Sequence, residues 1–171
     1  MLRRANPPPF ALTSGLVPVL FFLNYYLRQV YCTGVSMGGY GCWVAATGRT
    51  AAGAQRFAAV APVCGAGAVD PLALGGALPV WAFHAANDVV VPVGTTDRMV
   101  SGLRAARGSG GGGAGGAAEA VGSAAVKYTR YDEAPAPTGW EDYDGHASWK
   151  LAYRGPDLFD WLLEQRRPSE P

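Results

Sequence analysis

The sequence has few charged residues, only two histidines and only three cysteines, and these shortages exclude several classes of function. Charged side chains make up 16% of the 171 residues and leave a net charge of +1, so neither a polyelectrolyte tail nor a nucleic-acid-binding surface is expected. Cys32, Cys42 and Cys64 show no C-x-x-C spacing and are odd in number, which predicts neither a zinc site nor a full disulfide framework. Because no metal or cofactor motif is found, any chemistry is expected to come from side chains and backbone donors alone.

The first 27 residues form an apolar segment of uncertain role. Residues 10–27 are an 18-residue uncharged run that follows Arg3 and Arg4, as in a signal sequence or signal anchor. Pro18 interrupts this run, and no small-x-small cleavage site separates it from the strand expected near residue 29. We therefore favour packing near the sheet over targeting. The compartment stays open between the cytoplasm, which we favour, and secretion or membrane anchoring.

The most informative motif is Gly34-Val35-Ser36-Met37-Gly38, which fits the pattern G-x-S-x-G. A β-prone segment at residues 29–35 precedes the serine, and a helix-compatible segment at 37–48 follows it. The sequence therefore predicts a strand, a tight turn and a helix, with Ser36 in the turn. The alternative is that Ser36 is only a small residue that suits a tight turn.

The residues around this serine suit nucleophilic chemistry. Gly34 and Gly38 are expected to let the strand and the helix approach each other, so that Ser36 stands clear of neighbouring side chains. The helix N-terminus offers free N–H groups to a developing oxyanion, and the N–H of Met37 is the expected donor.

An acid and a base follow the serine in the order that such a site requires, Ser, Asp/Glu, His. Asp88 lies in a polar loop after an apolar strand at 79–84, and His146 lies in a turn before a helical stretch. Each has an alternative interpretation: Asp88 as an Asx-turn residue, and His146 as a helix N-terminal residue with no base role. His84, at the end of its strand, is expected to be a structural histidine that bonds the backbone.

Strands and helices alternate along the sequence, which predicts a three-layer α/β fold with a mostly parallel sheet and right-handed crossovers. A Gly/Ala-rich stretch at 108–122 holds seven glycines among the nine residues 108–116 and is expected to be a flexible surface loop. The expected strands are residues 29–35, 57–63, 79–84 and 125–131, and the expected helices are residues 37–48, 95–106, 147–153 and 157–166.

Together these stretches resemble the α/β-hydrolase superfamily, in particular the esterase and predicted-peptidase group related to phospholipase/carboxylesterase and feruloyl esterase domains. The resemblance implies Ser36 as nucleophile, His146 as general base and then acid, and Asp88 as the carboxylate that orients the imidazole. It also implies a serine hydrolase that acts on small-molecule carboxylic esters, with thioesters and peptides as alternatives, and that needs no cofactor. The matching stretches are residues 33–43, 57–65, the Asp88 segment and residues 145–149.

The part of the sequence that resembles the family starts only a few residues before Ser36. Only 35 residues precede Ser36, where complete members of the family have several strands and helices. We therefore expect the C-terminal half of an α/β-hydrolase fold, with a partial domain at residues 28–167 after the apolar segment 1–27. The loop that supplies the second oxyanion donor in the family has no counterpart upstream. The competing expectation is an inactive remnant that acts as an interaction module or does not fold alone. The oligomeric state stays open.

Overall fold

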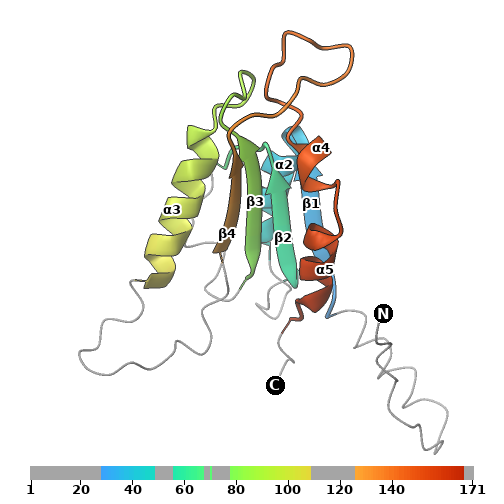
Figure 1. Cartoon of the computed structure of the whole chain (residues 1–171). Coiled ribbons are helices and arrows are strands. Elements are labelled where there is room, and N and C mark those ends of the chain that lie inside the picture. Colours follow the sequence, from blue (N-terminus) through green and yellow to red (C-terminus); the bar gives the residue numbers. More distant parts are fainter. Residues whose placement is uncertain (1–27, 49–55, 68–69, 71–77, 109–125, 168–171) are drawn as a thin grey trace, which may run out of the picture.

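A computed structural model of the chain describes residues 28–48, 56–67, 70, 78–108 and 126–167. The apolar segment 1–27 and the Gly/Ala-rich loop beyond Gly108 lie outside these ranges. Four parallel strands form one sheet in the order β1-β2-β3-β4, with helices on both of its faces (Figure 1). The strands are β1 (Tyr31–Val35), β2 (Ala59–Val63), β3 (Val80–Ala85) and β4 (Val126–Tyr131). The helices are α2 (Met37–Ala46), α3 (Gly94–Gly108), α4 (Trp149–Ala152) and α5 (Asp157–Glu164).

The two central strands consist mostly of apolar residues because both of their faces are covered. All five residues of β2 are buried, as are five of the six residues of β3. A parallel strand between two helix layers has no solvent-facing side, so its sequence is continuously apolar and does not alternate. In β1 and β4 every residue is at least partly exposed.

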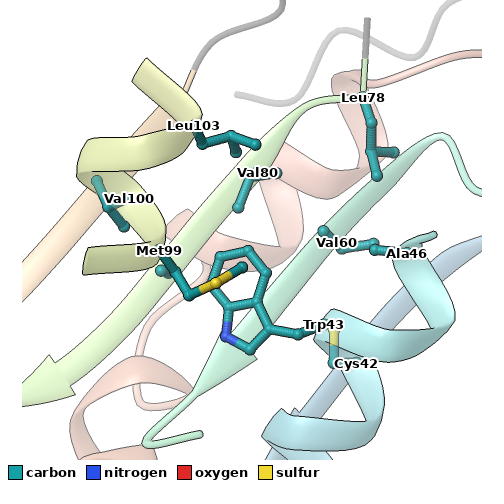
Figure 2. Packing of buried hydrophobic residues seen from close by; sticks show 10 residues of the cluster. Cys42, Trp43, Ala46, Val60, Leu78, Val80, Met99, Val100 and Leu103 are labelled. Carbon is teal, nitrogen blue, oxygen red and sulfur yellow. The ribbon is translucent and has the colours of Figure 1, made fainter. Parts of the chain in front are cut away.

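Helices α2 and α3 cover one face of the sheet through a core centred on Trp43. This indole is completely buried, and its Nε1 donates a hydrogen bond to the carbonyl of Gly65 across 3.2 Å. Figure 2 shows the ring between α2, the sheet and Met99 of α3. The buried members of this cluster are Cys42, Trp43, Ala46, Val60, Leu78, Val80, Ala82, Met99, Val100 and Leu103.

Helices α4 and α5 cover the other face. Leu158, Trp161 and Leu162 of α5 are buried there, at the i, i+3 and i+4 spacing of one helix face, whereas Phe159 remains 46% exposed. The Trp161 ring meets the Trp81 ring edge-on at 5.5 Å. The predicted three-layer α/β architecture is therefore confirmed. In the part of the chain that the structure describes, none of the helices has the length and hydrophobicity of a membrane-spanning segment.

Candidate active site

Three loops bring the predicted site residues to one end of the sheet. Ser36 directly follows β1, Asp88 lies in the loop after β3, and His146 lies in the long connection between β4 and α4. Because all four strands are parallel, the carboxyl ends of β1, β3 and β4 meet at the same edge (Figure 1).

Ser36 is held in a strained backbone conformation between β1 and α2. Its φ is 53° and its ψ is −118°, a combination that costs a non-glycine residue about 1–3 kcal/mol. Two hydrogen bonds fix the turn: the Ser36 N–H donates to the Val63 carbonyl at 3.0 Å, and the Tyr40 N–H donates to the Ser36 carbonyl at 3.1 Å. These hydrogen bonds tie Ser36 both to the neighbouring strand β2 and to the start of helix α2.

The two glycines of the motif differ in how closely they are packed. A Cβ added at Gly34 would lie 2.5 Å from the carbonyl oxygen of Gly38, so the close approach of strand and helix depends on glycine at position 34. A Cβ added at Gly38 would meet nothing within 4 Å. The expectation of a steric need at both positions is thus right for Gly34 and wrong for Gly38.

The hydroxyl, imidazole and carboxylate form a continuous chain of hydrogen bonds. Ser36 Oγ lies 2.9 Å from His146 Nε2, and His146 Nδ1 lies 2.9 Å from Asp88 Oδ2. Because Nδ1 faces a carboxylate, it carries the ring hydrogen of the neutral imidazole, and Nε2 is left to accept the Ser36 hydroxyl hydrogen. Both His146 and Asp88 are buried. The structure thus brings together the three residues that the sequence singled out.

Asp88 also shapes its own loop. Its Oδ1 accepts hydrogen bonds from the N–H groups of Val90 at 2.9 Å and Val91 at 2.8 Å, which is the Asx-turn arrangement. Oδ2 meanwhile faces His146. The two interpretations of Asp88 are therefore compatible: the Asx turn uses Oδ1, whereas His146 Nδ1 lies nearer to Oδ2, at 2.9 Å, than to Oδ1, at 3.2 Å.

His84 is a further partner of this carboxylate. Its Nε2 lies 2.9 Å from the Val91 carbonyl, as expected for a structural histidine, but also 3.1 Å from Asp88 Oδ2. Its Nδ1 lies 2.8 Å from Thr96 Oγ1 on α3, and the ring is fully buried. The contact with Asp88 was missed from the sequence. Two histidines therefore converge on one carboxylate, and only His146 also reaches Ser36.

These contacts set the charge state of Asp88. Burial alone raises the pKa of its carboxyl, but hydrogen bonds from His84, Val91, His146 and Val90 outweigh burial and hold the pKa below the ordinary value of 3.8. Asp88 is therefore a carboxylate at neutral pH and faces His146 with a full negative charge.

The lowered pKa predicts how Asp88 contributes to stability. A carboxyl with a lowered folded-state pKa stabilises the fold above its unfolded pKa, and this contribution is lost as the pH falls through the folded value. We therefore expect the difference in free energy of unfolding between the wild type and Asp88→Asn to narrow as the pH falls below the unfolded value of about 4. Urea unfolding at each pH measures it. A difference that stays constant as the pH falls would contradict the lowered pKa.

The first turn of α2 faces the same edge. Its first N–H groups, from Met37 onward, have no partner within the helix, and no side chain caps them. The helix dipole adds to their positive potential. This is the position expected of an oxyanion donor.

One group of potential metal ligands lies at the site. Cys64, Asp88 and His146 each offer a ligand atom within 4.8 Å of the others. Asp88 and His146 are already bonded to each other, and burial raises the pKa of the Cys64 thiol to about 11. The facing atoms of His146 and Asp88 are thus engaged in a hydrogen bond that competes with metal binding.

Comparisons with known proteins identify the fold. No protein-family model and no curated protein matches the sequence. Among solved structures, a thermostable esterase is similar with a TM-score of 0.61 and 30% identity, over 89% of this chain and 37% of that chain. A Klebsiella pneumoniae protein assigned as a dienelactone hydrolase matches with a TM-score of 0.51 and 20% identity, over 80% of this chain and 52% of its own. An α/β hydrolase from a Medee basin deep-sea metagenome library matches with a TM-score of 0.51 and 16% identity, over 80% of this chain and 55% of that chain.

The chain therefore spans less than two thirds of the length of each of these proteins. Its four parallel strands in sequence order, its helices on both faces and these structural matches together show that the chain has part of the α/β-hydrolase fold.

Proposed function

We propose that the chain is a serine hydrolase that cleaves carboxylic esters through an acyl-Ser36 intermediate. The observation that carries this proposal is the unbroken chain of contacts from Ser36 Oγ through the His146 ring to Asp88 Oδ2, with 2.9 Å at each step. A nucleophile within hydrogen-bond reach of a base, which a third group in turn orients, is the arrangement that covalent acyl transfer requires.

The geometry supports the following sequence of steps. His146 Nε2 accepts the Ser36 proton while Oγ attacks the ester carbonyl carbon, and the resulting imidazolium donates that proton to the departing alcohol oxygen. Asp88, a carboxylate at neutral pH, stabilises the imidazolium through Nδ1. Water then attacks the acyl group by the same route and releases Ser36.

The negative charge of the tetrahedral intermediate would fall at the start of α2. In this proposal the Met37 N–H donates to the oxyanion and is helped by the helix dipole. Loss of one oxyanion donor lowers turnover by about 100-fold to 1,000-fold in such sites, so a second donor would matter greatly for rate.

The surroundings of the site favour substrates with apolar groups. Several side chains near it are large, hydrophobic and exposed, and the Tyr143 ring lies edge-on to the His146 ring at 6.4 Å. Such a surface suits the acyl or alcohol part of an apolar ester better than a charged group. These exposed residues are Met37, Val89, Val90, Trp140 and Tyr143.

Covalent labelling tests the proposal. Purified chain is incubated with a fluorophosphonate probe and read by intact mass, with Ser36→Ala as the control. Near-stoichiometric labelling that disappears in the control is expected if Ser36 is an activated nucleophile. Hydrolysis of p-nitrophenyl esters of increasing acyl length, compared with matched thioesters and peptide anilides, then tests the substrate class.

Folded protein that is not labelled would overturn the proposal. If the protein is folded by circular dichroism but takes up no probe, the geometry is not sufficient for activity. The chain would then be an inactive member of the superfamily, the alternative that acts as an interaction module.

A further inference from the structure

Two of the three cysteines lie against each other on either side of the turn that carries Ser36. Cys32 is in β1, four residues before the serine, and Cys42 is in α2, six residues after it. The Cys42 thiol lies 3.3 Å from the main-chain carbonyl oxygen of Cys32. Both residues pack in the core cluster between the sheet and α2, so their side chains share one face of β1.

The two thiols differ in exposure. Cys42 is fully buried, while Cys32 is partly exposed, so a small solute in water has access to the pair through Cys32. Cys64 is also buried. The structure thus places one partly exposed thiol and one buried thiol in the same cluster.

The electrostatics of the pair assign different roles to the two sulfurs. A hydrogen bond from the Cys42 thiol lowers the pKa of Cys32 below its ordinary value, against the opposing effect of burial. The same hydrogen bond, together with burial, raises the pKa of Cys42. Cys32 is therefore the thiol of the pair that ionises first, and the thiolate is the form that reacts with oxidants.

We propose that Cys32 and Cys42 are a redox-sensitive pair that closes to a disulfide across the turn at Ser36 when the chain meets hydrogen peroxide. The inference concerns the thiols alone and does not depend on the proposed hydrolase activity. Such a bond would join β1 directly to α2 and restrain the strained turn between them.

The chemistry balances in two steps. The Cys32 thiolate attacks one peroxide oxygen, the O–O bond breaks, and a sulfenic acid forms as hydroxide leaves and takes up a proton to become water. Cys42 sulfur then attacks the Cys32 sulfur, the S–O bond breaks, and the leaving oxygen departs as a second water carrying the Cys42 proton. Two thiols are oxidised to one disulfide and one peroxide is reduced to two waters. Once Cys32 is a neutral sulfenic acid, the negative charge that raises the pKa of Cys42 is gone.

Peptide mapping of the wild-type chain tests the proposal without any substitution. Trypsin releases residues 29–49, which hold both Cys32 and Cys42, and residues 57–98, which hold Cys64 alone. After treatment with a slight excess of peroxide, we expect the 29–49 peptide to lose the mass of two hydrogen atoms and to resist alkylation. Chymotryptic cleavage after Tyr40, between the two cysteines, should then give halves that separate only on reduction.

Variants and an unfolded control sharpen the result. Cys32→Ser and Cys42→Ser should each abolish the mass loss, while Cys64→Ser should behave as the wild type. The bond should form faster in the folded chain than in urea, because the fold brings the thiols together. Oxygen addition at Cys32 with Cys42 still open to alkylation, a linkage to the 57–98 peptide, or equal rates in native and unfolded protein would each overturn the proposal.

Discussion

Replacing His146 by alanine is expected to lower the rate at which Ser36 is acylated by about four to six orders of magnitude, while the chain stays folded. Only the His146 ring lies within hydrogen-bond distance of both Ser36 Oγ and Asp88 among the described residues. Without it, no group next to the serine accepts the hydroxyl proton, and the neutral hydroxyl is a weak nucleophile. The rate of fluorophosphonate labelling measures this step directly, and circular dichroism reports on the fold.

The second histidine provides a matched control. His84 contacts the same carboxylate oxygen as His146 but faces Val91 and Thr96, not Ser36. We expect His84→Gln to destabilise the Asp88 loop and to slow acylation by about 100-fold or less, as a small misplacement of Asp88 would do. Equal losses in the His146 and His84 variants would mean that both act through the loop, which would contradict a base role for His146. Near-normal labelling of His146→Ala would also contradict it.

The sheet could be predicted from sequence because its signals are local. The residues of β2, Ala59–Val63, form a short apolar run of the kind that a strand covered on both faces needs. The direction of two pairs followed because strands separated by a helix pair in parallel, as α2 separates β1 from β2 and α3 separates β3 from β4. Helix ends were less accurate: the helix expected at 147–153 is Trp149–Ala152, because the residues just before it are held by turn hydrogen bonds, such as that from the Ala147 N–H to the Pro135 carbonyl.

The three predicted site residues come together because their motifs place them at strand ends, but their exact partners follow from tertiary contacts. The His84 contact with Asp88 depends on how the chain turns after β3, and a spacing of four residues across a strand end has no fixed geometry as it would in a helix. Gly145 and Asn87 are in close contact although they lie far apart in the sequence. A Cβ at Gly145 would lie 2.3 Å from the Asn87 carbonyl carbon, and no local pattern connects positions so far apart.

Of the two motif glycines, Gly34 is the one that the packing of β1 against α2 requires. Gly34→Ala is expected to destabilise the chain by about 3 kcal/mol or more and to abolish probe labelling of Ser36. The added Cβ would lie 2.5 Å from the Gly38 oxygen and 2.6 Å from the Gly38 carbonyl carbon. Both are backbone atoms, so no side-chain rotation relieves the overlap, and β1 and α2 must move apart at the turn that holds Ser36.

Gly38→Ala is the matched control within the same five residues. Its added Cβ meets nothing within 4 Å, and the residue lies in α2. Alanine at a helical position restricts the unfolded chain more than glycine does, so Gly38→Ala is expected to be neutral or to stabilise by up to about 1 kcal/mol. Urea unfolding of both variants measures the contrast. If both lose the same stability, the motif requires glycine for a reason other than the close approach at Gly34; if neither does, the strand and helix are less tightly joined than the 2.5 Å contact implies.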